Sequence, residues 1–532
     1  MEACREDPSL KSVKPGCHTR TRRRSIPTHR RVLLTTIGLF IAIFMATLSG
    51  AIIVNALPRI IEDLDGTQRQ YSWVFAAPLV TATVATTVWG RLADRTSKKR
   101  LAQASVLIFI LGSILTGLAK NTEVLIGLRG IQGVGVGGLL SLVHIVMASM
   151  IPSRERGRYM GYLGVVTALA IVAGPLLGGI IVDTPVLGWR WCFWIGVPVG
   201  VVALLLLECM PPLRTPVSHT GNSVLGAILL LSSISTLLVW VTLVGDLFEW
   251  SSWPSATVAG GGIALAILAW LVERGSTDPV VPLRIIRKRT MALAITASMA
   301  VAIVTMSTLV HAAQYFQITR GYTPTQSGAL VVPMMLGLMC AMFVSGHMVT
   351  RTGRWKGHLI VGTALATVGI ALLGTINQAT SLVHLGIYMS LLGSGLGACT
   401  QNLILVAQDS LMYRDLGAGT SIMAFFQSLG SAAGVTFLGT LLALKSEQVF
   451  ADGMAAHPGT GEWIGEGEIL SWIQTRPVPG PTRDLAERAY GEAIALTFHV
   501  SAGAALAAFV AVLFLPAVSL RTTVGRVEAP NE

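Results

Sequence analysis

Long apolar segments separated by short polar loops run through most of the chain. Each segment holds about 20 residues, enough for a helix to cross the roughly 30 Å hydrocarbon core of a membrane. Only helices and closed barrels satisfy every backbone group in lipid, and continuous apolar runs of this length exclude barrel strands. The pattern predicts fourteen transmembrane helices, at about residues 33–57, 72–91, 101–119, 124–150, 158–182, 189–209, 222–244, 254–273, 290–315, 324–349, 358–376, 383–407, 417–442 and 492–516.

The composition supports a polytopic helical membrane protein. The 532 residues are 52% hydrophobic and 12% charged, which is too apolar for an ordinary soluble domain. The sequence contains no nucleophile–base set, phosphate loop or cofactor motif, so we expect neither an enzyme nor a bound cofactor. The six cysteines lack metal-ligand spacing, and we therefore expect neither a metal site nor a disulfide framework.

The basic residues predict the orientation of the chain in the membrane. If the N-terminus is cytoplasmic, Lys and Arg fall on inner segments about three times as often as on outer loops, as the positive-inside rule requires. We therefore expect both termini in the cytoplasm of a plasma-membrane protein. The net charge of +12 is spread over many short loops, so no nucleic-acid partner is needed to explain it. The expected partners are membrane lipid and a small amphipathic substrate, and the expected state is a monomer.

One charged loop occurs twice and indicates an internal duplication. Residues 90–100 read GRLADRTSKKR, and a weaker copy, GHMVTRTGRWK, begins 256 positions later at residue 346. Two parallel repeats that rock about a central site are a common basis of alternating access. The predicted organisation is a basic tail at 1–31, a six-helix bundle at 32–210, a linker with two inserted helices at 211–289, a second six-helix bundle at 290–516 with an outer loop at 443–491, and a tail at 517–532.

The first copy of the loop has the features of a gate. Gly90 lets its helix press against a neighbour, and Asp94 can face the positive N-terminus of another helix. Arg95 and Arg100 offer partners for carboxylates. Thr350 stands in the second copy where Asp94 stands in the first, so the latch should be asymmetric. The alternative is a loop that is basic only to fix topology. The predicted gating residues outside the first copy are Gly346, Arg351, Gly174, Pro175 and Gly178.

Arg129 is a charged residue well inside a predicted span. A buried guanidinium costs several kcal/mol unless it faces protein or water, which makes Arg129 a functional candidate. Gln132 lies one turn later on the same face. The alternative is a structural arginine bonded to carbonyl groups of the first span.

Several motifs together resemble one family. The loop at 90–100 resembles the signature between spans 2 and 3 of the major facilitator superfamily, and residues 32–516 are covered by the resemblance. The fourteen spans point to its drug:proton antiporters of the EmrB/QacA type. The further motifs are LRGIQG at 128–133, AGPLLGG at 173–179, WRWCFWI at 189–195, QYFQ at 314–317 and GYTPTQ at 321–326.

The resemblance implies a secondary active exporter of drugs, toxins or metabolites that works by alternating access and draws on the proton gradient. It implies a role for Arg129 in proton or substrate coupling. The motif around Gly174, Pro175 and Gly178 is a feature of the exporters, although these residues are also devices for close helix packing and a kink. The open alternatives are a facilitator or importer of the same fold without proton coupling, and a membrane receptor that transports nothing.

The first span departs from the antiporter pattern. Ser49 replaces the usual acid, and Ala51 replaces the usual threonine. No acid lies near the middle of the membrane, so histidine is the natural group to titrate. His311 is the first candidate, with His144 and His499 behind it; the alternative for each is a packing role. We expect either His311 or the network of Asp94 to carry coupling.

The substrate cavity should be lined by polar and aromatic residues of the spans. With no buried acid, a neutral or anionic amphiphile is favoured over a cation. Gln427 stands where the branch often has an arginine. The residues predicted for coupling or the cavity are Ser49, Asn55, Arg129, Gln132, His311, Gln314, Tyr315, Gln401, Asn402 and Gln427.

Overall fold

The fold is taken from a computed structural model of the chain. Apart from scattered single residues, it describes residues 29–64, 68–184, 188–211, 251–274, 283–322, 324–412, 415–456 and 480–517.

The described residues form helices joined by short loops, and no strand occurs among them. The first half contains α1 (His29–Asp63), α2 (Gln68–Arg95), α3 (Lys98–Gly117), α4 (Thr122–Met150), α5 (Ser153–Asp183), α6 (Trp191–Trp194) and α7 (Gly196–Glu208). The middle contains α9 (Trp253–Arg274) and α10 (Leu283–Ile286). The second half contains α11 (Arg289–Gln314), the π-helix η1 (Tyr315–Thr319), α12 (Pro324–Thr352), α13 (Lys356–Leu373), α14 (Leu382–Asp409), α15 (Leu416–Ala456) and α17 (Gly480–Leu513).

Twelve helices in the described part of the chain are long and apolar enough to cross a membrane. The prediction of fourteen spans is therefore not confirmed. The predicted span 72–91 lies within α2, which has 28 residues but is not among the twelve. The predicted span 222–244 lies largely outside the described residues. Of the two helices predicted between the bundles, the structure therefore describes mainly the second, which is α9.

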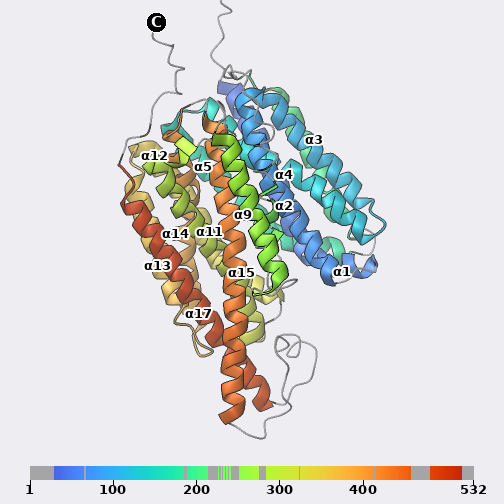
Figure 1. Cartoon of the computed structure of the whole chain (residues 1–532), viewed down its shortest axis with the longest axis vertical. Helices are drawn as coiled ribbons and strands as arrows, with labels where there is room; N and C mark the ends of the chain where they lie inside the picture. The colour runs from blue at the N-terminus through green and yellow to red at the C-terminus, as the bar shows by residue number, and fades with distance from the viewer. Residues whose placement is uncertain are drawn as a thin grey trace, which may run out of the picture.

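The helices pack as two related bundles, which lie side by side in Figure 1. In the first bundle α1 packs against α5 and α7, and α2 packs against α4. In the second bundle α11 packs against α15 and α17, and α12 packs against α14. The bundles meet where α5 contacts α12 and where α2 contacts α15. Each pairing has its counterpart at the same place in the other half, as a duplicated chain requires.

Matching glycines explain why the corresponding helices cross so closely. A Cβ on Gly137 of α4 would lie 2.1 Å from the carbonyl oxygen of Ala82 in α2. A Cβ on Gly393 of α14 would lie 2.0 Å from the carbonyl oxygen of Met334 in α12. Gly393 follows Gly137 by the same 256 positions that separate the two charged loops. Small residues at such crossings let helix backbones approach in a membrane.

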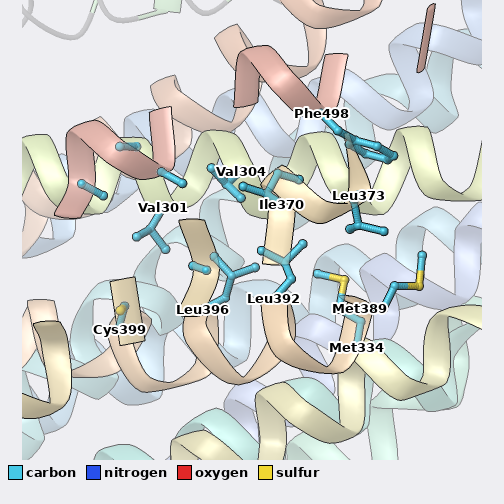
Figure 2. Packing of buried hydrophobic residues seen from close by; sticks show 14 of the residues in the cluster. Val301, Val304, Met334, Ile370, Leu373, Met389, Leu392, Leu396, Cys399 and Phe498 are labelled. Atoms are coloured by element: carbon cyan, nitrogen blue, oxygen red, sulfur yellow. The ribbon is translucent and has the colours of Figure 1, made fainter. Parts of the chain in front are cut away.

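The second bundle has a continuous apolar core. Figure 2 shows Val304 of α11, Ile370 of α13 and Leu392 of α14 between Val301 of α11 on one side and Phe498 of α17 on the other. Each of these side chains is buried. Apolar side-chain packing therefore connects the helices of this bundle.

Two helices continue beyond the predicted spans into the region predicted as the outer loop 443–491. With 41 residues, α15 is about 60 Å long, about twice the hydrocarbon thickness. The end of α15 and the start of α17 pack against each other, and both project past the other helices in Figure 1. Phe450, Ala486 and Tyr490 are buried there, so packing extends both helices where the polar sequence predicted a loop.

Candidate functional site

The carboxylate of Asp94 joins the two bundles at the end that carries the α2–α3 loop, here called the loop end. One carboxylate oxygen accepts a hydrogen bond from the backbone N–H of Gly417 at 3.0 Å, and the other accepts one from Ala418 at 3.1 Å. Both amides lie in the first turn of α15, where a negative charge is stabilised. Burial raises the pKa of Asp94 to about 7, although the two amides and the nearby Lys98 and Arg91 lower it.

Gly90 permits this contact by letting α2 touch α15. A Cβ on Gly90 would lie 1.7 Å from Oγ of Ser421 and 2.7 Å from the carbonyl oxygen of Gly417. The Ser421 hydroxyl also donates a hydrogen bond to the carbonyl oxygen of Thr86 at 3.0 Å. The crossing therefore has no room for a side chain at position 90.

The second copy of the loop makes the corresponding contact with weaker chemistry. A Cβ on Gly346 of α12 would lie 2.5 Å from the carbonyl oxygen of Gly157 in α5. Thr350 accepts a hydrogen bond from the backbone N–H of Arg158 at 2.7 Å, where Asp94 offers a carboxylate. Arg154 donates to the carbonyl oxygen of Arg351 at 3.2 Å. The contact at the first loop therefore uses a carboxylate, and the contact at the second loop uses a hydroxyl.

The two arginines predicted beside Asp94, Arg95 and Arg100, differ in their exposure. Arg95 is half-buried in the last turn of α2, and Arg100 is exposed on α3. The carboxylate of Asp94 points to backbone amides of the opposite bundle. The described partners of this carboxylate are thus the N-terminal amides of α15.

A second buried link across the bundles joins Arg156 of α5 to Gln408 of α14. The guanidinium NH1 donates to Oε1 of Gln408 at 2.7 Å, and Nε2 of Gln408 donates to the hydroxyl of Thr420 at 3.0 Å. Nearby, Nε2 of His144 lies 3.4 Å from Oε1 of Gln401. Sequence reasoning missed Arg156 and Gln408 because each looks like an ordinary polar residue at a span end.

The described hydrogen bonds between the two bundles all lie toward the loop end. They involve residues 86–162 of the first half and 347–421 of the second half. Away from this end, Gly174 and Gly178 of α5 pack instead against Ala51 and Ile52 of α1, within their own bundle. The side chain of Pro175 lies outside the described residues. The described polar contacts thus close one end of the molecule.

Within the first bundle, the structure brings three of the predicted coupling residues together. NH1 of Arg129 donates to Oε1 of Gln132 at 2.6 Å, and Nε2 of Gln132 lies 3.4 Å from Oγ of Ser49. Nε2 of Gln132 also donates to Ser113 of α3 at 2.7 Å. All four side chains are buried. Ser113 was missed because a serine in an apolar span carries no signal of its own.

The predicted residues of the second half do not join this cluster. Gln427 donates to Ser298 at 2.7 Å, and Asn402 donates to Ser345 at 3.2 Å. Oε1 of the half-buried Gln314 is enclosed without a hydrogen-bond partner. The side chain of Asn55, on α1, lies outside the described residues.

The aromatic and imidazole candidates of the second half lie inside its own bundle. Nδ1 of His311 hydrogen-bonds the carbonyl oxygen of Ser307 at 2.8 Å, and the Ser307 hydroxyl lies 3.3 Å from that of Ser501 in α17. The hydroxyl of Tyr315 donates to the carbonyl oxygen of Asn377 at 2.8 Å. His311 and Asp94 therefore belong to separate polar networks, and Tyr315 anchors the loop between α13 and α14.

No group of three His, Cys, Asp or Glu side chains in the described parts of the chain could hold a metal ion. The described cysteines are Cys192, Cys209, Cys340 and Cys399, and all four are free.

Comparisons with known proteins agree with this architecture. The family model described as Major Facilitator Superfamily matches residues 39–435. An uncharacterized MFS-type transporter of Mycobacterium tuberculosis is 30% identical over 93% of this chain and 70% of its own length. The multidrug transporter protein MdtP of Bacillus subtilis is 30% identical over 80% of this chain and 77% of its own. The multidrug resistance protein 3 of the same species is 27% identical over 93% and 97%.

Solved structures share the fold at low identity. The human organic anion transporter MFSD10 superposes with a TM-score of 0.60 at 13% identity, over 91% of this chain and 100% of its own. The proton:xylose symporter XylE superposes with a TM-score of 0.55 at 14% identity, over 92% and 96%. At these identities the likeness concerns the fold alone.

Proposed function

Because the chain belongs to the major facilitator superfamily, we propose that it is a proton-driven exporter of small amphipathic molecules that works by alternating access. A member of this superfamily is a membrane transporter and not an enzyme. The confinement of the inter-bundle hydrogen bonds to the loop end carries the proposal. A transporter whose bundles are hydrogen-bonded together at one end can exchange substrate at the other end. When those hydrogen bonds break, the first end can open and the other can close.

The direction of transport is proposed to be outward, across a plasma membrane. Relatives named as multidrug proteins and the exporter-type motif around Gly174 both favour export. We place the loop end in the cytoplasm, together with both termini, because the excess of Lys and Arg lies on that side. The contacts described above then belong to the state that is closed toward the cytoplasm, of a protein that works as a monomer in lipid.

The proposed energy source is the proton gradient, with no bound cofactor. Ser49 leaves the first span without its usual acid, so another group must exchange protons. Asp94 is suited to this because its pKa of about 7 in the closed state lies near physiological pH. The network of Asp94 thereby gains support over His311, which lies among Ser307 and Ser501 inside its own bundle.

The closed loop end should be favoured by acidification. When the bundles separate, water reaches the carboxyl of Asp94 and its pKa returns toward about 4. The closed state then binds the proton more tightly, so its advantage is fully present below about pH 4 and is lost as the pH rises through about 7. Spin-label distances between Leu92→Cys and Met412→Cys, in a background without other cysteines, should shorten from about pH 8 to about pH 5.

The matched variant for this measurement is Asp94→Asn, which keeps the size of the side chain and removes its titration. We expect the distance distribution of Asp94→Asn to be flat across the same pH range. A pH response that survives in this variant would assign the titration to another group.

Export can be tested in a bacterial host without its own efflux pumps. Expression of the chain should lower the accumulation of amphipathic compounds, and an uncoupler should abolish the difference. Proteoliposomes with an imposed pH gradient should move substrate and protons in opposite directions. Faster equilibration without lowered accumulation, unchanged by the uncoupler, indicates a facilitator. Raised accumulation indicates an importer, and no change for any compound contradicts transport of this class.

A further inference from the structure

Arg129 of α4 is a buried cation that the described residues do not neutralise. Its side chain is 4% exposed. The guanidinium donates to Oε1 of Gln132 at 2.6 Å and to the carbonyl oxygen of Val74 at 3.4 Å, and it lies 5.9 Å from the ring centre of Phe193. Among the described side chains no carboxylate lies within ion-pair distance of it. Burying a charge without a counter-ion is costly, so the missing negative charge calls for an explanation.

Ser49 of α1 lies beside this cluster. Its hydroxyl lies 3.4 Å from Nε2 of Gln132, the residue that bonds Arg129. Ser49 stands where the antiporter pattern has an acid, so an acid here would reach the same cluster. A serine supplies a neutral hydroxyl instead, which can donate a hydrogen bond to an incoming oxygen.

Arg129 also keeps donors available. Its described hydrogen bonds use Nε and NH1, and none uses NH2. A guanidinium with a free edge is suited to bind a carboxylate through two parallel hydrogen bonds.

We propose that Arg129, Gln132 and Ser49 form the subsite that binds the anionic head of the exported molecule, which is an amphipathic carboxylate. This rests on the proposed export function and specifies its substrate class. The substrate supplies the negative charge that the first span lacks, and its apolar tail lies among the apolar helices. An acid at position 49 would occupy Arg129 itself and turn the site toward cations.

Three probes with one tail test the proposal: dodecanoate, dodecanol and dodecyltrimethylammonium. Binding is measured on the full chain in nanodiscs, after subtraction of the signal from nanodiscs without protein. The wild type should bind dodecanoate at least tenfold more tightly than the cation. Ser49→Asp should weaken the binding of dodecanoate at least tenfold and strengthen the binding of the cation. The neutral Ser49→Asn should still bind the anion more tightly than the cation.

Variants of Arg129 separate recognition of the head from a structural role. Arg129→Gln should remove the preference for dodecanoate and leave dodecanol binding within about twofold, whereas Arg129→Lys should retain part of the preference. Equal loss of all three probes in Arg129→Gln would show that the arginine only supports the fold. Equal wild-type affinity for anion and cation would also overturn the proposal.

The outcome for the subsite and the outcome for export can be told apart. If proteoliposomes export the cationic probe under a pH gradient and Ser49→Asp changes nothing, export stands and the anionic subsite is wrong. If dodecanoate binds in an Arg129-dependent way but no gradient moves any probe, the subsite stands and active export is wrong.

Discussion

Gly90→Leu is expected to abolish export while the chain still folds and inserts into the membrane. The new Cβ would lie 1.7 Å from the Ser421 hydroxyl and 2.7 Å from the carbonyl oxygen of Gly417, which is backbone and cannot turn aside. Overpacking of this kind costs about 1–3 kcal/mol or more, and here the cost falls on the closed loop end alone. Export in vesicles should drop to the background level, with normal amounts of protein in the membrane.

Two other glycines provide the controls for Gly90→Leu. A Cβ on Gly503 of α17 would meet no atom within 4 Å, so Gly503→Leu should export normally. A Cβ on Gly137 would lie 2.1 Å from the carbonyl oxygen of Ala82, inside one bundle, so Gly137→Leu should lose folded protein itself. Normal export by Gly90→Leu would mean that the α2–α15 contact plays no part in the cycle.

Gln408→Leu is expected to shift the protein strongly toward the state that is open at the loop end. Oε1 of Gln408 accepts the 2.7 Å hydrogen bond from the buried guanidinium of Arg156. A hydrogen bond to a charged group contributes about 1.5–3 kcal/mol, which corresponds to roughly 10- to 150-fold in the equilibrium between the two states. The distance between labels at Leu92→Cys and Met412→Cys should lengthen, and export should fall in proportion.

Gln408→Glu is the variant matched to this change. A carboxylate of the same length pairs with Arg156 as an ion and should hold the loop end closed. Both variants should therefore slow export, but the label distance should lengthen in Gln408→Leu and shorten in Gln408→Glu. Equal distances in the two variants would contradict a role of the Arg156–Gln408 bond in closure.

The membrane-spanning helices and the duplication could be predicted from the sequence because both depend on short segments of it. A run of about 20 apolar residues is enough to indicate a span, and the repeat at an offset of 256 is visible in the letters themselves. Gly90 was predicted to bring helices together, and the structure provides its partner, Gly417. The extended ends of α15 and α17 could not be predicted, because buried residues such as Phe450 and Ala486 stabilise each other across about 35 positions of a polar region.

The candidate site depended on pairings that the sequence does not encode locally. Arg129 and Gln132 were adjacent on one predicted face, and their hydrogen bond follows from helix geometry. The place of Ser49 beside them required the packing of α1 against α4. Likewise, nothing near Arg156 in the sequence indicates Gln408, which follows it by 252 positions.

The sequence by itself determined that this chain is a duplicated helical membrane protein with a charged loop in each half, because hydrophobic length and repetition are properties of short segments. The tertiary structure decided which groups those loops meet. It gave Asp94 the first-turn amides of α15 and gave Thr350 the amide of Arg158. It also placed no described carboxylate within ion-pair distance of Arg129. Such pairings follow from the packing free energy of whole helices against one another, which no short segment contains.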